Sequence, residues 1–387
     1  MTLQKRPTLY LLAIAELLGM AVWFSASAVA PQLAKLWQLG DGGRAGLTIC
    51  VQLGFVAGAL VSALFNISDR WPAHLLLAGS AIAAAAATAA IPALDVSFAG
   101  AIVLRGLTGF FLAGVYPVGM KIMATWTVED RGWAIGLLIG ALTLGSAYPH
   151  LLQALGRAAD WRLLLYQAAA SAALGGVIAA LVIREGPHRA QAPPFHWQFV
   201  GEVLSQREVL LANLGYLGHM WELYAMWTWS PVLLASLGAS PIVSFAVIGV
   251  GAVGSLVAGK FADRIGRTRV INASLIVSGA CSLCVGMFYG RSYPMLLAVM
   301  LVWGFAVVAD SAQFSACVTE LCPREYMGTA VTLQTCLGFL LTIVTLRMIP
   351  ALQSRVGWRW AFAVLALGPA AGVWAITALQ HRLKPQA

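Results

Sequence analysis

The stretch Gly259-Lys260-Phe261-Ala262-Asp263-Arg264-Ile265-Gly266-Arg267 closes a long apolar run in the second half of this 387-residue chain. Its Asp-Arg pair has an equivalent in the first half, Asp69-Arg70, which also stands at the end of an apolar run. A constant offset across several landmarks indicates that one unit has been duplicated. Three further landmarks recur at nearly the same offset of about 195 residues: Gly109 with Gly304, Gly132 with Gly328, and Trp161-Arg162 with Trp358-Arg359.

The composition places the chain in a lipid bilayer. Hydrophobic residues make up 60% of it, charged residues 10%, and the mean hydropathy is +0.81, which leaves too little polar surface for a soluble protein of 40.9 kDa. A helix of about 20 residues crosses the hydrocarbon core, whereas barrel strands would alternate in polarity. The apolar stretches long enough to cross number twelve: 8–34, 45–66, 73–94, 97–122, 133–153, 161–184, 208–234, 241–260, 270–289, 292–317, 326–349 and 356–379.

The sequence therefore predicts an all-α membrane protein with twelve transmembrane helices in two pseudo-symmetric six-helix bundles. Residues 1–184 would form the N-terminal bundle and residues 208–387 the C-terminal bundle. Residues 185–207, the one polar segment of any length, would be a cytosolic linker. Duplicated helical domains are the usual construction of secondary transporters, which bind their substrate between the repeats.

The distribution of basic residues predicts the orientation. Glu16 lies inside the first apolar stretch and, together with the length of that stretch, favours a retained helix over a cleaved signal peptide. Most of the 24 Lys and Arg residues fall on the side of the N-terminus, so both termini are expected in the cytoplasm of a protein of the inner membrane. The same bias explains the net charge of +9 without a nucleic-acid partner. The six cysteines lie mostly inside spans and indicate packing, so no metal and no cofactor are expected.

The stretch 259–267 matches in full the pattern G-x-x-x-D-R-x-G-R, a signature of the major facilitator superfamily. The chain resembles this family over nearly its whole length, and Arg105-x-x-x-Gly109 is similar to the family's second motif, whose arginine is associated with proton coupling. The resemblance implies a secondary transporter that works by alternating access. Because the first-half loop keeps only its Asp-Arg pair, gating is expected to depend on the second half. The gating residues so implied are Gly259, Asp263, Arg264, Gly266, Arg267, Asp69 and Arg70.

The fifth span departs from the family's antiporter pattern. Gly136 and Gly145 have the required spacing, but the expected Gly-Pro is shifted to Tyr148-Pro149-His150 and no glycine pair follows. This departure disfavours a drug or proton antiporter, and the resemblance assigns no substrate-defining branch.

Ionised side chains inside a membrane cost at least about 2.5 to 3.5 kcal/mol, so each one needs a partner or a cavity. Glu222 lies with His219 and Met226 on one face of an aromatic-rich span. It either carries a proton in the wall of a substrate cavity or makes an interhelical hydrogen bond. The residues predicted to couple transport to protons are Glu222, Glu16, Arg105 and Asp310.

Two of these acids leave alternatives open. Glu16 is expected to take up a proton because burial disfavours the charged form of a carboxyl group, but a permanent ion pair with Arg105 or Lys121 explains it equally well. Asp310 is expected to serve coupling or the substrate pocket. Its alternative is local hydrogen bonding to the eleventh span, which offers the polar groups of Gln334, Thr335 and Thr342.

The substrate cavity is expected to combine one cation with aromatic rings. Arg105 favours an anionic or polar solute, and the rings tolerate a partly apolar one, so the predicted substrate is a small organic or anionic metabolite. The predicted cavity residues are Arg105, Trp23, Tyr116, His219, Trp221, Tyr224 and Gln334.

Other function classes fit the sequence less well. A membrane enzyme would need a clustered catalytic set, but His74, His150 and His219 are scattered, so no enzymatic activity is expected. Proton-driven efflux of amphipathic compounds is an alternative, and a non-transporting receptor or scaffold on the same fold is another. The expected partners are the lipid bilayer, a small-molecule substrate and protons, and the expected state is a monomer.

Overall fold

The computed structural model describes residues 5–127, 130–156, 160–188 and 195–383, and every regular element within these ranges is a helix. The chain clusters into two compact units. Unit 1 comprises Met1–Gln191 with Leu234–Ala246, and unit 2 comprises Ala192–Leu233 with Val247–Ala387. Residues 189–194 of the predicted linker and both ends of the chain lie outside the described ranges. The predicted bundle boundaries at 184 and 208 stay a prediction.

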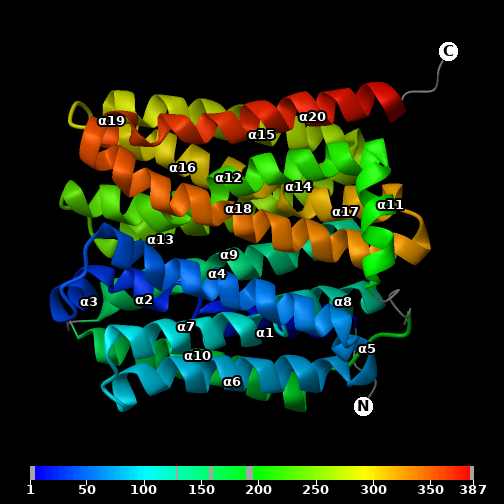
Figure 1. Ribbon diagram of the computed structural model, residues 1–387, viewed down its shortest axis with the longest axis horizontal. Helices are drawn as coiled ribbons and strands as arrows, with labels where there is room; N and C mark the ends of the chain where they lie inside the picture. Colours follow the sequence, from blue (N-terminus) through cyan, green and yellow to red (C-terminus); the bar gives the residue numbers. More distant parts are fainter. Residues whose placement is uncertain (1–4, 128–129, 157–159, 189–194, 384–387) are drawn as a thin grey trace. The chain divides into compact units, whose positions relative to one another are not determined.

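Unit 1 contains the helices of the first half of the chain (Figure 1). They are α1 (Lys5–Met20), α2 (Ser25–Ala28), α3 (Ala30–Leu36), α4 (Asp41–Leu64), α5 (Ile67–Arg70), α6 (Ala73–Ala93), α7 (Phe98–Leu112), α8 (Tyr116–Trp126), α9 (Arg131–Leu155) and α10 (Trp161–Leu181). Small residues allow α6 to pack closely, since its Ala81, Ala84 and Ala85 are all buried.

Unit 2 contains most of the remaining elements. They are η1 (Trp197–Phe199), α11 (Val200–Ser205), α12 (Arg207–Ser236), α13 (Pro241–Gly249), α14 (Gly251–Ile265), α15 (Arg267–Phe288), α16 (Tyr293–Ala309), α17 (Ser311–Leu321), η2 (Arg324–Tyr326), α18 (Met327–Val356), α19 (Trp358–Ala361), η3 (Ala363–Ala366) and α20 (Leu367–Leu383). The last residues of α12 and the start of α13 cluster with unit 1.

The two units repeat one packing scheme. In unit 1, α7 packs against α4 and α6, and α6 packs against α10. In unit 2, α16 packs against α14 and α15, and α15 packs against α20. The spans Phe98–Trp126 and Tyr293–Leu321 even have the same length of 29 residues. The internal duplication indicated by the sequence is therefore present in the fold.

Close helix crossings depend on the paired glycines. A Cβ atom on Gly109 would lie 1.9 Å from the carbonyl oxygen of Val51, and one on Gly304 would lie 1.8 Å from that of Val247. Real side chains do not tolerate such distances, so only glycine allows α4 to contact α7 and α13 to contact α16 this closely. The recurrence of Gly109 and Gly304 in the sequence thus reflects a shared packing requirement.

Ten helices within the described ranges are long and apolar enough to cross a membrane, and the protein is an all-α membrane protein. The first and seventh of the twelve predicted spans do not meet these criteria. The first is interrupted, because α1 ends at Met20 after 16 residues and residues 21–24 form turns before α2 begins. The seventh is the 30-residue α12, whose polar residues lower its mean hydropathy. The count of twelve stays a prediction.

Candidate functional site

Helix breaks position several of the predicted site residues. In unit 1, turns at residues 21–24 separate α1 from α2, and turns at 113–115 separate α7 from α8. Pro117 lies in the first turn of α8, where its missing N–H leaves no gap in the hydrogen bonding. In unit 2, Asp310 is the single residue between α16 and α17. A break leaves backbone carbonyls without their helical partners, so other groups must satisfy them.

Arg105 satisfies carbonyls at the first of these breaks. Its side chain is fully buried in unit 1. Nη1 donates to the carbonyl oxygen of Val22 at 2.7 Å, Nη2 donates to that of Trp23, and Nε donates to that of Leu47 at 3.4 Å. Nη1 also donates to Ser25 Oγ at 3.4 Å. The guanidinium is therefore held by backbone dipoles of the interrupted first span, whereas the sequence suggested an acid or the substrate as its partner.

Glu16 lies elsewhere in unit 1 and is fully buried, and neither of its carboxyl oxygens has a hydrogen-bond partner among the residues that the structure describes. Its Oε2 lies against Gly119 of α8, where a Cβ atom would come within 2.7 Å of it. The ion pair considered for Glu16 with Arg105 or Lys121 is not formed, because Arg105 contacts carbonyls and Lys121 pairs with Asp69. Glu16 is thus an acid of α1 that contacts α8 and is not part of an ion pair with Arg105 or Lys121.

Glu222 of α12 is held by two donors in unit 2. Trp303 Nε1 donates to Oε1 at 2.6 Å, and Ser278 Oγ donates to Oε2 at 2.8 Å. All three side chains are buried. The contact joins α12 to α15 and α16, so the interhelical hydrogen bond that the sequence allowed for Glu222 does form. This geometry is compatible with a proton-binding role as well.

His219 and Asp310 form a second buried polar cluster of unit 2. Nδ1 of His219 lies 2.9 Å from Oδ1 of Asp310, and Nε2 lies 3.0 Å from Oγ of Ser311. Both the histidine and the aspartate are about 2% exposed. His219 thus lies between a carboxylate and a hydroxyl, one helical turn before Glu222. The partner of Asp310 comes from α12 and not from the eleventh span that the alternative named.

Gln334 of α18 is buried, and within the described ranges neither its amide oxygen nor its amide nitrogen has a hydrogen-bond partner. One turn later, Gly338 leaves space that the rings and side chains of Tyr216 and Met220 from α12 occupy. Gln334 is therefore an uncommitted polar side chain in the part of unit 2 where α12 meets α18.

Most of the aromatic residues predicted to line the substrate cavity make hydrogen bonds or ring contacts with other side chains or the backbone of their own unit. Trp221 Nε1 donates to the carbonyl oxygen of Val364 at 3.2 Å. Tyr224 packs against Phe339 with ring centroids 5.1 Å apart. In unit 1, Trp23 packs edge-on against Phe55 at 5.2 Å, and Tyr116, the first residue of α8, is half-buried near Glu16.

The first-half gate loop carries an ion pair. Lys121 Nζ of α8 contacts Asp69 Oδ1 and the carbonyl oxygen of Ser68. The side chain of Asp69 is only 9% exposed. Arg70, at the end of α5, is exposed. The ion pair of Asp69 with Lys121 therefore links α8 to the loop after α4, which carries the incomplete copy of the motif.

The second-half gate loop has another arrangement. Arg267 donates to Glu320 Oε1 at 2.9 Å and to Gln313 Oε1 at 3.0 Å, which ties the loop to α17. Asp263 and Arg264 are exposed, and no ion pair within the described ranges includes Asp263. Gly259 is buried in α14. Gly266 separates α14 from α15 with φ +91°, a conformation that side chains rarely adopt, which explains the glycine of the motif.

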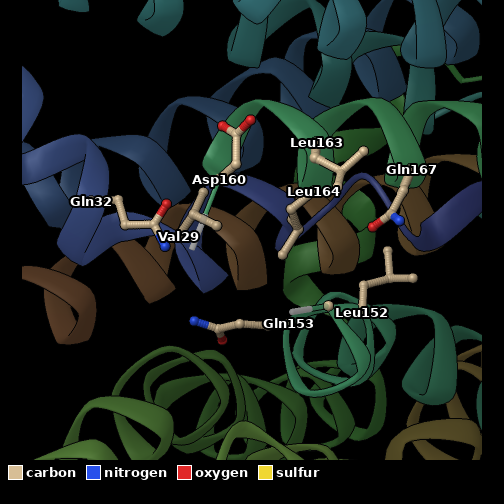
Figure 2. Close-up of a pocket in the computed structure, with 9 residues that line it drawn as sticks. Val29, Gln32, Leu152, Gln153, Asp160, Leu163, Leu164 and Gln167 are labelled. Atoms are coloured by element: carbon tan, nitrogen blue, oxygen red, sulfur yellow. The ribbon is translucent and has the colours of Figure 1, made fainter. Parts of the chain in front are cut away.

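A small pocket of unit 1 lies away from these residues. It lies where the end of α9 meets α3 and the start of α10, and Gln32, Gln153 and Gln167 are among its lining residues (Figure 2). Asp160 at its edge accepts a hydrogen bond from the backbone N–H of Arg162 at 2.9 Å and so caps α10. The pocket contains none of the predicted site residues, and within the described ranges no three His, Cys, Asp or Glu residues are placed to hold a metal ion.

Several residues of the site were not predicted. Ser278 and Trp303 hold Glu222, Ser311 contacts His219, and Gly119 lies against Glu16. Trp303 immediately precedes Gly304, one of the repeated landmarks, and this position could have singled it out. The others carry no signal in the sequence, because serine and glycine are common in membrane helices.

Known proteins share this fold and parts of this sequence. The gallate transporter of Pseudomonas putida is 27% identical over 226 residues, which span 54% of this chain and 49% of that protein. The minor myo-inositol transporter IolF of Bacillus subtilis is 33% identical over 93 residues, 24% of this chain and 19% of that protein. The matches therefore span half or less of these relatives' lengths.

The fold comparison covers the whole chain. The human organic anion transporter MFSD10 superposes with a TM-score of 0.71 at 18% identity, over 97% of this chain and 100% of that one. The sequence model described as Major Facilitator Superfamily matches residues 12–345 and 242–387. Together with the duplicated packing and the complete motif at 259–267, this match shows that the chain belongs to the Major Facilitator Superfamily.

Proposed function

We propose that this protein is a secondary transporter that moves a small solute across the membrane by alternating access, coupled to protons. The observation that carries the proposal is the buried pair of His219 and Asp310, with the half-buried Ser311 in contact with the histidine and Glu222 one helical turn away. A histidine between a carboxylate and a hydroxyl can pass a proton from one to the other. Buried groups of this kind in membrane helices are costly and are usually functional.

Family membership supports transport, and the relatives' names support a small solute. Their names include gallate, an aromatic carboxylate, and myo-inositol, a neutral polyol, so they leave the charge of the substrate open. The predicted alternatives are efflux of amphipathic compounds and a receptor or scaffold without transport. The protein would lie in the inner membrane with both termini in the cytoplasm.

The proposal is tested with purified protein in liposomes. A pH gradient should drive uptake of a solute from a panel of polyols, carboxylates and phosphate. Glu222→Gln and Asp310→Asn should reduce gradient-driven uptake to the level of empty liposomes while solute exchange without a gradient continues, because the amides keep the shape but cannot ionise. Ser282→Ala is the control, since this buried hydroxyl donates to the carbonyl oxygen of Gly279 in its own helix.

Two results would contradict the proposal. Gradient-driven uptake at the wild-type rate in both acid variants would remove these residues from proton coupling. Absence of any gradient-driven or exchange flux across the panel, with folded protein, would favour the receptor or scaffold.

A further inference from the structure

The buried guanidinium group of Arg105 already has hydrogen-bond partners within the protein. Among the described residues, Arg105 is the one buried arginine or lysine. All three of its nitrogens donate to protein oxygens, and the acceptors include the carbonyls of Val22, Trp23 and Leu47. An anionic substrate would have to displace these contacts and leave carbonyls at the helix break unsatisfied, which is unfavourable for buried groups.

The basic side chains of His219 and Lys121 have partners within the protein as well. Both ring nitrogens of His219 have partners, Asp310 and Ser311. Lys121 contacts Asp69 and the carbonyl of Ser68. Arg105, His219 and Lys121 are therefore each occupied by partners within the protein, and an anion would have to displace those partners.

Two buried side chains have the opposite character. Glu16 of unit 1 is 0% exposed, and neither of its carboxyl oxygens has a hydrogen-bond partner among the described residues. Gln334 of unit 2 is 1% exposed, and in the same part of the chain its amide oxygen and nitrogen both lack a partner. Leaving such groups unpaired is costly, so a ligand or water must satisfy them at some stage of the cycle.

The chemistry of these two residues fits hydroxyl groups. A carboxyl group accepts hydrogen bonds from O–H donors, and an amide both donates and accepts, which matches a hydroxyl group in both roles. We propose that the transported solute is a neutral, hydroxyl-rich compound of the polyol class, and that Glu16 and Gln334 each bind hydroxyl groups within their own unit. This inference rests on the proposed transport function and replaces the anionic solute that Arg105 suggested from the sequence.

Binding selectivity of the wild-type protein tests the inference without any variant. Purified full-length protein is titrated with myo-inositol, sorbitol, gallate, inorganic phosphate and choline. Saturable binding of at least one of the two polyols, with weaker or no binding of the two anions and of choline, is the expected result. Preferential binding of gallate or phosphate overturns the inference, and so does preference for choline, which would assign Glu16 to an organic cation.

Variants then test the assigned residues. Glu16→Leu and Gln334→Leu, which remove the hydrogen-bonding groups altogether, should each weaken polyol binding about tenfold or more, the loss of one hydrogen bond to a buried partner. Thr143→Val and Ser282→Ala are matched controls in units 1 and 2, because these buried hydroxyls donate to carbonyls of their own helices. Polyol affinity unchanged in both test variants overturns the residue assignment. Gel filtration and thermal unfolding show whether each variant is folded.

The two proposals fail separately. If the protein couples gallate or phosphate uptake to a pH gradient and binds neither polyol, the transport function stands and the polyol inference falls. If it binds polyols but shows no flux of them in either direction, the transport function falls while the binding chemistry of Glu16 and Gln334 stands.

Discussion

Gly304 lies so close to Val247 that a Cβ atom on the glycine would come within 1.8 Å of the valine's carbonyl oxygen, and Gly109 stands in the same relationship to Val51 at 1.9 Å. Gly304→Ala and Gly109→Ala are therefore each expected to force the crossing helices apart and to destabilise the protein by about 1–3 kcal/mol or more. Thermal unfolding in detergent measures the effect. Gly79→Ala is the control, because nothing lies within 4 Å of a Cβ atom there. Equal melting temperatures for all three variants would contradict the crossing geometry.

Arg105→Ala should destabilise unit 1 by leaving the carbonyls of Val22, Trp23 and Leu47 without their donor. Arg105→Lys should recover little of the lost stability, because one ammonium group cannot reach acceptors that a planar guanidinium spans. Unfolding temperature and protease sensitivity near residues 21–24 measure both variants. An alanine variant as stable as the wild-type protein would show that the helix break at residues 21–24 does not require Arg105.

Asp69→Asn and Asp263→Asn are expected to differ, in an order opposite to the one that the complete motif suggests. Asp69 is 9% exposed and paired with Lys121, whereas Asp263 is exposed. Loss of the pair between Asp69 and Lys121 should cost more free energy than the about 0–1 kcal/mol that an exposed ion pair contributes. Asp69→Asn should therefore shift the distribution of conformations more than Asp263→Asn does. Labelling of single cysteines introduced into α1 and α12, from each side of the membrane, measures that distribution. A larger shift for Asp263→Asn would restore the second half as the dominant gate.

Gly119→Ala should act through Glu16, because the added Cβ would lie 2.7 Å from Oε2 of that carboxyl. The side chain of Glu16 must then move, so the variant is expected to change solute affinity in the same direction as Glu16→Leu. The double variant should show little further loss, since both changes affect one group. Additive losses in this cycle would mean that Gly119 serves packing alone.

The sequence predicted the elements of this fold that depend on local pattern. Apolar stretches of sufficient length gave ten of the spans, and the repeated Gly109 and Gly304 marked equivalent helix crossings. The interruption of the first span was not predictable, because Val22-Trp23-Phe24 contains neither glycine nor proline. The carbonyls of its turns accept hydrogen bonds from Arg105, a residue 83 positions after Val22 and 82 after Trp23.

The sequence allowed the ionisable residues of the candidate site to be predicted, but not the residues that they contact. Buried charges stand out in a membrane sequence, so Glu16, Arg105, Glu222 and Asp310 could be named. Their neighbours come from distant helices, as Trp303 does for Glu222, and no spacing in the sequence encodes that approach. Asp310 shows the same limit, since its neighbour on α12 could be recognised only from the folded chain.

The acceptors of Arg105 have an evolutionary consequence. Three of them are main-chain oxygens, which every amino acid at positions 22, 23 and 47 supplies alike. Substitutions at those positions can neither remove nor restore the acceptors, so no compensating mutation at them accompanies a change at Arg105. Among homologues that share this break, the arginine should therefore stay invariant without any covarying partner, and methods that infer contacts from correlated mutations would overlook the interaction.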